Sequence, residues 1–178
     1  MLAVACENFR DVGMSLELVT GTSIFPTGRL LRGGRIDDIT DLTEIGGAAT
    51  IINLRHHPDA ETLGSVHLQF PAPNNQENYE TAAGVTAKWL VEVMQTFADT
   101  STELPVLVHC RSGKDRTGIV VAAVLAICGI DRRAIIDEYL LSDGEVRIEW
   151  IEAALDGFAD LEHYFRRVDL EAVRRRFS

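Results

Sequence analysis

The residues whose types and spacing best suit chemistry lie in one stretch, His109–Gly118, which reads HCRSGKDRTG. A cysteine, Cys110, stands near its start, and Arg116 follows six positions later. The residues before the stretch are typical of a buried strand, and those after it of a buried helix. Successive backbone N–H groups in such a turn, backed by a helix N-terminus, form a concave anion site. The stretch therefore predicts a thiol nucleophile at the floor of an anion cradle.

These residue types suit attack on a phosphomonoester. The positive field of the turn favours the thiolate of Cys110, and the planar guanidinium of Arg116 can hold two phosphate oxygens at once. We expect the Thr117 hydroxyl to donate a hydrogen bond to the Cys110 sulfur. The N–H groups of the turn are expected to bind the remaining oxygens. The expected catalytic set is Cys110, Asp115, Arg116 and Thr117, and the expected phosphate-binding set is Arg111, Ser112, Gly113 and Lys114.

Asp115 is the nearest acidic residue that can protonate the leaving oxygen and later activate water. The residues alone leave two other roles open for it, which are to cap the following helix or to pair with Arg10. The Lys114 cation either favours a multiply charged phosphate or lies in solvent. Arg111 is expected at the periphery of the turn.

Length, charge and cysteine count narrow the class of protein. A chain of 178 residues predicts one domain over 1–178. A formal net charge of −10 argues against nucleic acid as the main partner. Three cysteines are an odd and small number, which does not suggest a disulfide framework. This count fits a reducing, cytoplasmic setting. No signal peptide and no apolar run of ~18 residues is found, so stable membrane insertion is not expected. The oligomeric state is left open.

Strand-like and helix-like segments alternate along the chain. Ser15–Val19, followed by the turn Thr20–Thr22, predicts a hairpin. Further strands are predicted at 29–32, 50–54, 66–70 and 106–108. Helices are predicted at 37–45, 77–98, 119–126, 131–141, 147–156, 159–167 and 169–177, with Val85, Trp89, Val93 and Phe97 as the apolar stripe of the second. The alternation indicates an α/β domain with an at least partly parallel sheet, whose ligands bind beyond the carboxyl ends of the strands.

The loop resembles a known signature. Cys110, five intervening residues and then Arg116-Thr117 are similar to the phosphate loop of cysteine-dependent protein tyrosine phosphatases, and the GKDRTG variant resembles the bacterial tyrosine/serine phosphatases. Four distant segments resemble the same family in order and rough spacing over nearly the whole chain. They are NFRDVG at 8–13, GRLLRGG at 28–34, IINLR at 51–55 and YLLS at 139–142.

The resemblance implies a protein-tyrosine-phosphatase-like three-layer fold, with a central mostly parallel sheet flanked by helices. It also implies a phosphocysteine (thiophosphoryl-cysteine) intermediate and no metal or other cofactor. Residue by residue, it implies Cys110 as nucleophile, Arg116 as phosphate clamp and Asp115 as general acid. The last agrees with a local observation, because Phe70–Tyr79, where eukaryotic-type relatives carry an acid loop, contains Glu77 but no aspartate.

The chain departs from the family pattern at two places. Asn53 stands where the family usually has aspartate. Only eight residues separate Leu141 from Trp150, where relatives often carry a longer helical insertion that covers the site. We therefore expect no helical lid over Cys110 and a more open pocket.

Several other polar residues have a structural interpretation. Residues 8–11 are expected to brace the phosphate loop from below, whereas Arg55 either lines the pocket or braces its strand end. Adjacent histidines such as His56 and His57 rarely bind metal without further ligands. Cys6 and Cys128 are expected to be inert. The arginines at 174–176 are expected to form a solvated helix end.

The sequence thus predicts a phosphomonoester hydrolase that acts on phosphotyrosine or phosphoserine proteins, a phosphoinositide or a small-molecule phosphate. The first alternative is a phosphatase of a phosphorylated small metabolite in a biosynthetic pathway. A second is a non-catalytic phosphate-binding module, against which the intact Cys110, Asp115 and Arg116 argue. A third is sulfur transfer by a rhodanese-like loop, which has no need of the Arg116-Thr117 pair.

Overall fold

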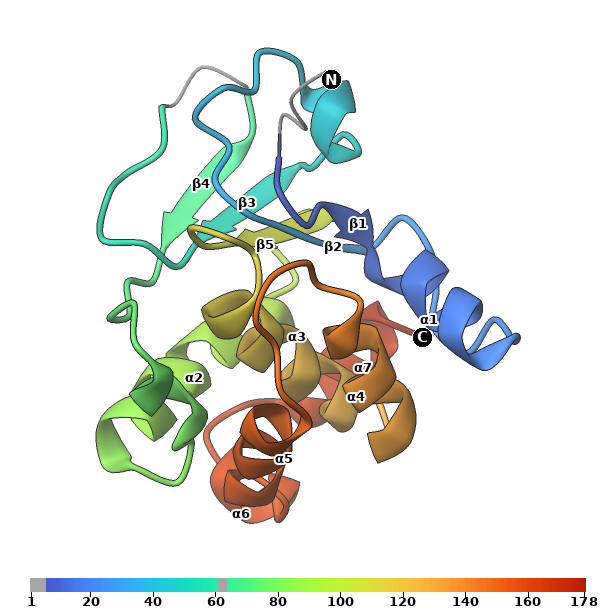
Figure 1. The fold of residues 1–178 in the computed structure, drawn as a ribbon, viewed down its shortest axis with the longest axis vertical. Helices are drawn as coiled ribbons and strands as arrows, with labels where there is room; N and C mark the ends of the chain where they lie inside the picture. The colour runs from blue at the N-terminus through green and yellow to red at the C-terminus, as the bar shows by residue number, and fades with distance from the viewer. Residues whose placement is uncertain (1–5, 61–63) are drawn as a thin grey trace.

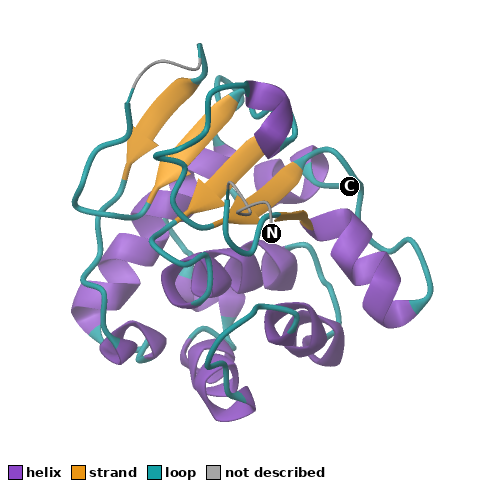
Figure 2. Cartoon of the chain, turned by 45° about the horizontal axis from the view of Figure 1, so that its top comes forward, coloured by secondary structure: helices purple, strands orange, loops and turns teal. Residues whose placement is uncertain are grey.

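The strands of the computed structural model, which describes residues 6–60 and 64–178, form one mixed sheet (Figures 1 and 2). Its strands are β1 (Arg10–Asp11), β2 (Leu30–Gly33), β3 (Thr50–Asn53), β4 (Val66–Gln69) and β5 (Val106–His109), in the order β1-β2-β5-β3-β4. The pairs among β2, β5, β3 and β4 are parallel, and only β1 pairs in the antiparallel sense. The four strands predicted from 29 onward are confirmed, and β1 is additional.

Helices cover one face of the sheet, and mainly irregular chain covers the other (Figure 1). The helices are α1 (Val12–Thr20), α2 (Gly84–Ala98), α3 (Asp115–Ile127), α4 (Arg132–Leu140), α5 (Ile148–Gly157), α6 (Leu161–Tyr164) and α7 (Leu170–Arg176), with 3-10 turns η1 (Leu42–Ile45) and η2 (Gln76–Tyr79). The larger apolar core lies between the sheet and α2–α7, and α3 runs through it with almost every residue buried. A smaller core beneath η1 joins Ile36, Ile45 and Ile51 on the opposite face. The predicted mostly parallel sheet with flanking helices is confirmed.

The predicted hairpin at 15–22 is wrong, because this segment is helix α1. The Asp11 carboxylate caps the helix by accepting from the N–H groups of Gly13 and Met14. Gly21 ends it with a φ of 72°, in the left-handed region that favours glycine. Val12 and Leu16, four positions apart, are both buried. A short run of mixed polarity fits both the two-residue period of a strand and the period of about 3.6 residues of a helix. Here the Asp11 cap favours the helix.

Two predicted helices begin later than expected. The segment 37–45 forms only η1, which starts after a capping box between Asp41 and Glu44 and ends at Gly46 as predicted. The helix predicted from 77 starts at Gly84, because Ala83 is extended with a ψ of 134°. As a result Val85 is 82% exposed and is not part of the buried stripe.

The buried stripe of α2 otherwise consists of the predicted Trp89, Val93 and Phe97. The helices predicted at 131–141, 147–156 and 169–177 are confirmed to within a few residues, as is the helix after Gly118. The helix predicted at 159–167 is reduced to the four-residue α6.

The sheet topology places the functional stretch at a central position. β5 lies between β2 and β3, and His109 is in register with Gly33 on one side and Asn53 on the other. The carboxyl ends of three parallel strands therefore meet where Cys110 begins its turn into α3. This is the edge of a parallel sheet at which ligands bind.

Candidate active site

The loop from Cys110 to Lys114 joins the end of β5 to the start of α3, and Cys110 is only 2% exposed. The turn depends on Gly113, which has a φ of 72°. A Cβ atom at this position would lie 2.5 Å from the carbonyl carbon of Gly33 and 2.6 Å from the backbone nitrogen of Gly34. Only glycine therefore allows the loop to pass so closely over the end of β2.

The backbone carbonyls of the loop are held by donors from other segments. The carbonyl of Arg111 accepts from the backbone N–H of Arg35 at 3.0 Å. The carbonyl of Ser112 accepts from the Asn8 amide at 2.8 Å, and that of Gly113 from the Arg32 guanidinium at 2.9 Å. In a planar trans peptide the N–H points opposite to the C=O. The N–H groups that follow these carbonyls therefore point away from the bracing donors.

None of the hydrogen bonds found among the described residues uses the N–H groups of residues 111–114 as donors. Exposed chain usually satisfies such groups with water, but a row of unused N–H groups beside a helix N-terminus also binds anions. This backbone geometry is compatible with the predicted oxyanion cradle, whose role in binding stays a prediction. Its outer braces are residues 8 and 32, which belong to the two N-terminal segments that resemble the phosphatase family.

The guanidinium of Arg116 is buried, with 3% of the residue exposed. Its Nη1 donates to the carbonyls of Leu54 and Ala72 at 3.1 and 3.0 Å, and its Nη2 donates to Oδ1 of Asn74 at 3.1 Å. Its Nε is buried without a partner in the described part of the chain. No ion pair of the described residues includes Arg116. A buried cation with only neutral acceptors is complementary to a bound anion.

Asp115, the first residue of α3, is held by a tyrosine. Its Oδ1 accepts from the Tyr79 hydroxyl at 2.7 Å, and that hydroxyl lies 2.7 Å from the hydroxyl of Tyr139. The alternative in which Asp115 pairs with Arg10 is wrong, because Arg10 instead forms an ion pair with Glu138 at 2.8 Å. Burial, followed by the mutual hydrogen bond and Asp115, raises the pKa of Tyr79 far above its ordinary value. Tyr79 therefore remains a hydrogen-bond donor throughout the neutral range.

The remaining loop side chains differ in their surroundings. Arg111 is exposed, as expected, and Ser112 is half-buried. The Lys114 ammonium donates to the carbonyl of Glu145 at 3.2 Å, so it bridges to the connection between α4 and α5. The Thr117 hydroxyl is buried and has no partner among the described residues. The hydrogen bond expected from Thr117 to the Cys110 sulfur is therefore not formed.

Behind the loop, His109 and Arg55 share the carboxylate of Asp59. The imidazole Nε2 of His109 lies 2.7 Å from one oxygen of Asp59, and Arg55 contacts the other at 2.7 Å and Asp37 at 2.8 Å. Burial favours a raised pKa for Asp59, but the hydrogen bonds and charges of His109 and Arg55 outweigh it and lower that pKa. Of the two roles left open for Arg55, the structure supports the brace at the strand end.

Asn53 supports this brace through its amide. Its Oδ1 accepts from the Arg55 N–H at 2.8 Å, and its Nδ2 donates to the carbonyl of His57 at 2.8 Å. The carboxylate that the position lacks is supplied to this region by Asp59, six residues further on. The described residues contain no cluster of three metal-binding side chains, including around His56 and His57.

A second brace joins β1, β2 and α4. Glu138 is 1% exposed and forms ion pairs with Arg10 at 2.8 Å and Arg32 at 2.6 Å. The Ser142 hydroxyl accepts from Arg10 at 3.0 Å. Through Arg32 this cluster reaches the carbonyl of Gly113. The prediction that residues 8–11 brace the phosphate loop is thereby confirmed.

The connection from Leu141 to Arg147 contains no helix, as predicted from its length. It lies against the loop, because the Asp143 N–H donates to the Asn8 amide oxygen at 2.7 Å and Lys114 reaches Glu145. The more open pocket expected from this feature stays a prediction.

The two other cysteines lie outside the loop. Burial raises the pKa of Cys6 to about 11 and that of Cys128 to about 12, which fits their expected inertness. The arginines at the end of α7 are less solvated than expected, because Arg174 donates to the carbonyl of Ile127 and Arg176 to that of Thr102.

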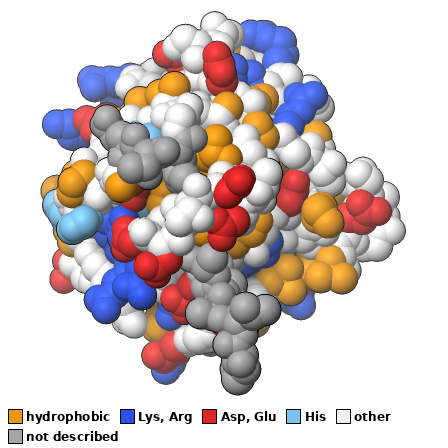
Figure 3. Space-filling model, turned by 90° about the horizontal axis from the view of Figure 1, so that it is seen from above, with side chains coloured by type: hydrophobic (Ala, Val, Ile, Leu, Met, Phe, Trp, Pro, Cys, Tyr) orange, Lys and Arg blue, Asp and Glu red, His pale blue; other side chains and the backbone are white. Residues whose placement is uncertain are grey.

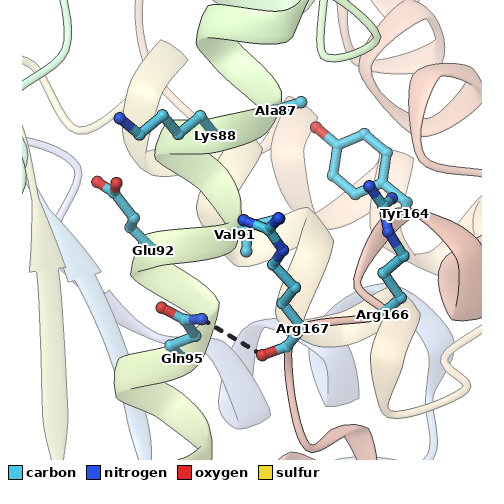
Figure 4. Close-up of a pocket in the computed structure, with 8 residues that line it drawn as sticks. All are labelled: Ala87, Lys88, Val91, Glu92, Gln95, Tyr164, Arg166 and Arg167. Atoms are coloured by element: carbon cyan, nitrogen blue, oxygen red, sulfur yellow. Dashed lines mark hydrogen bonds between the residues drawn. The ribbon is translucent and has the colours of Figure 1, made fainter.

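Charged side chains also gather away from the phosphate loop. On the face shown in Figure 3, acidic and basic side chains are interspersed. A groove of about 320 Å³ runs between α2 and the segment after α6 (Figure 4). It is lined by Lys88, Glu92, Arg166 and Arg167, and none of its lining residues belongs to the phosphate loop.

Sequence reasoning did not single out three residues that hold the site: Asp59, Asn74 and Tyr79. Asp59 and Asn74 lie in loops without periodicity, so only the fold brings them to His109 and Arg116. Tyr79 ends the segment Phe70–Tyr79, where eukaryotic-type relatives carry an acid loop. The presence of a tyrosine in a segment that lacks aspartate is the sequence feature that could have indicated its role.

The fold and this loop together define a cysteine-dependent phosphatase. The chain belongs to the tyrosine phosphatase family, whose model matches residues 3–175. A stretch of 42 residues is 57% identical to the triple specificity protein phosphatase PtpB of Mycobacterium tuberculosis. That match covers 24% of this chain and 15% of the relative, so it spans only a small part of the relative's length.

Two solved structures share the fold at low sequence identity. The core catalytic domain of the PP-IP phosphatase SIW14 from S. cerevisiae is 17% identical with a TM-score of 0.58, over 92% of this chain and 95% of that one. DUSP15 is 19% identical with a TM-score of 0.57, over 81% of this chain and 91% of that one. No helix in the described part of the chain has the length and apolar character needed to cross a bilayer.

Proposed function

We propose that this chain hydrolyses phosphomonoesters through a phosphocysteine intermediate on Cys110. The thiolate sulfur attacks phosphorus, the bond from phosphorus to the leaving oxygen breaks, and Asp115 gives that oxygen its proton. Ionised Asp115 then takes a proton from water, whose oxygen attacks phosphorus and releases inorganic phosphate together with the thiolate. The reaction needs no metal or other cofactor, because each step uses groups of the chain.

The observation that carries this proposal is the charge balance at Arg116. Its buried guanidinium has only neutral acceptors in the described part of the chain. It stands beside a loop whose N–H groups at 111–114 donate to none of the residues that the structure describes. A phosphate dianion supplies the missing negative charge, and these donors bind its oxygens more strongly as charge shifts in the transition state. Arg116 therefore acts as the clamp, and Arg111, Ser112, Gly113 and Lys114 act mainly through their backbone.

Protein phosphotyrosine and phosphoserine are the substrate classes that we propose. Support comes from family membership and from the segment shared with a relative named as a triple specificity protein phosphatase. We further propose that residues 1–178 form a single domain and that it works in the cytoplasm. The family model over residues 3–175 supports the first, and the free thiols of Cys6, Cys110 and Cys128 support the second.

The test is release of inorganic phosphate from p-nitrophenyl phosphate in the presence of a chelator. We expect wild-type activity to persist with chelator, and Cys110→Ser and Arg116→Ala to lose it. Inactive wild-type protein, or an active Cys110→Ser, would overturn the proposed mechanism. Phosphotyrosine and phosphoserine peptides, compared with inositol lipids and phosphorylated sugars, then test the substrate class.

A further inference from the structure

Asp115, Tyr79 and Tyr139 form a hydrogen-bonded row drawn from three separate elements. Tyr79 ends η2, Asp115 begins α3, and Tyr139 lies in α4. The Tyr79 hydroxyl is 2.7 Å from Oδ1 of Asp115 and 2.7 Å from the hydroxyl of Tyr139. Tyr79 thus links Oδ1 of the residue assigned as general acid to Tyr139, although the three residues are distant in the sequence.

The direction of these hydrogen bonds follows from the donors available. An ionised carboxylate only accepts, so Tyr79 donates its single hydroxyl hydrogen to Asp115. Tyr139 must then donate to the oxygen of Tyr79. Burial raises the pKa of both tyrosines, so neither hydroxyl loses its hydrogen near neutral pH. The row is therefore ordered one way, from Tyr139 through Tyr79 to Asp115, and each bond strengthens the next.

Packing fixes the positions of both hydroxyls. Tyr79 is 3% exposed, and its ring lies 5.8 Å from Trp150 and 6.3 Å from Tyr139 between centroids. Tyr139 is 1% exposed and packs on Gly118, where a Cβ atom would come within 2.9 Å of its ring. Neither ring can move without disturbing α3 or α5. Asp115 therefore meets a rigid donor.

We propose that Tyr79, supported by Tyr139, is a positioning residue that anchors Oδ1 of Asp115 and reserves Oδ2 for the proton given to the leaving group. Asp115 is half-buried, and its Oδ2 accepts no hydrogen bond from the described residues. A proton on Oδ1 would face the hydrogen of Tyr79 and would require the whole row to reverse. The inference rests on the proposed function, because it assigns a proton donor to the same reaction.

The inference also accounts for the segment Phe70–Tyr79. This segment lacks the aspartate that it would need to act as an acid loop. It contributes instead a tyrosine hydroxyl that orients an acid located in the phosphate loop. Its Asn74 meanwhile contacts Arg116 at 3.1 Å, so one segment positions both the acid and the clamp.

The experiment compares Tyr79→Phe, Tyr139→Phe and Asp115→Asn in phosphate release from phenyl phosphate and p-nitrophenyl phosphate across pH. Asp115→Asn should remove the alkaline limb of the pH–rate profile, where the rate falls as the acid loses its proton. It should also lower kcat on phenyl phosphate about 100-fold or more. Tyr79→Phe should move the alkaline limb to higher pH, because the ionised carboxylate loses a donor. Its kcat should fall about tenfold on phenyl phosphate and less on p-nitrophenyl phosphate, whose leaving group needs little protonation.

Tyr164→Phe is the matched control, because its hydroxyl donates to the Thr81 carbonyl at 2.6 Å, in a structural contact outside the loop. It should keep the wild-type profile. Tyr139→Phe keeps the bond from Tyr79 to Asp115 and should shift the limb in the same direction by a smaller amount. If Tyr79→Phe does not fold, the shift of the alkaline limb in Tyr139→Phe is the test.

The double variant Tyr79→Phe/Asp115→Asn separates positioning from general damage. If Tyr79 acts through Asp115, adding Tyr79→Phe to Asp115→Asn costs little further activity. A full additional loss, or an unchanged limb and leaving-group dependence in the tyrosine variants, would overturn the inference while the phosphatase function stands. Inactive wild-type protein would instead overturn the function itself.

Discussion

Glu138→Gln tests whether the buried charges behind the loop depend on one another. Glu138 is 1% exposed and forms ion pairs with both Arg10 and Arg32, the latter fully buried. Glutamine keeps the shape but leaves two cations without a counter-charge. Breaking a buried pair by removing one partner costs about 3–5 kcal/mol. In a domain of this size that corresponds to a fall in Tm of roughly 6–20 °C.

The assay is thermal and urea unfolding, with Asp137→Asn as the control from the neighbouring position. Asp137 pairs at 3.0 Å with Arg133, which is 73% exposed, so its loss should change stability by less than about 1 kcal/mol. Because Arg32 also holds the Gly113 carbonyl, Glu138→Gln should lower phosphatase activity at temperatures where the protein is still folded. Equal stability losses for the two variants would refute the reasoning.

Three further predictions concern the loop and its supports. Gly113→Ala should nearly abolish activity and lower Tm, because the new Cβ would collide with the backbone of β2; wild-type kinetics would contradict this. Asn74→Ala should raise KM about tenfold for p-nitrophenyl phosphate by freeing one arm of Arg116, with little change in Tm. The stability that Asp59 provides should be complete above its unfolded pKa of about 3.9 and lost as pH falls further, because its folded pKa is lower. In urea unfolding, the difference between wild type and Asp59→Asn should therefore be constant above about pH 5 and shrink below about pH 4.

The central part of the fold could be predicted because its signals are local. The apolar run of β5, the glycine turn and the apolar run of α3 are continuous in sequence, and together they place Cys110 between strand and helix. The hairpin predicted at 15–22 is wrong because a short segment of mixed polarity fits both the strand and the helix period. The helical state of this segment depends on the Asp11 cap, which a hairpin prediction ignores.

The supports of the site could not be predicted in the same way, because they are tertiary. Arg55 had two open roles in the sequence, and Asp37, eighteen positions earlier, decides between them. Tyr79 and Asp115 are 36 positions apart, and no period or motif links them. Thr117 is the reverse case. The sequence predicts a hydrogen bond from its hydroxyl to the Cys110 sulfur, but the structure does not form it. Motifs thus predict the reacting groups, whereas the fold determines what holds them.

Charge pairing among the buried arginines supports the proposal that phosphate binds at Arg116. In the described part of the chain the buried arginines are Arg32, Arg55 and Arg116. Arg32 pairs with Glu138, and Arg55 pairs with Asp37 and Asp59. Among the described residues, Arg116 donates hydrogen bonds only to carbonyl and amide oxygens. Keeping a guanidinium buried without a carboxylate destabilises the free protein, and an arriving anion removes that cost. The negative charge that Arg116 lacks is therefore the charge that the proposed phosphate would supply beside Cys110.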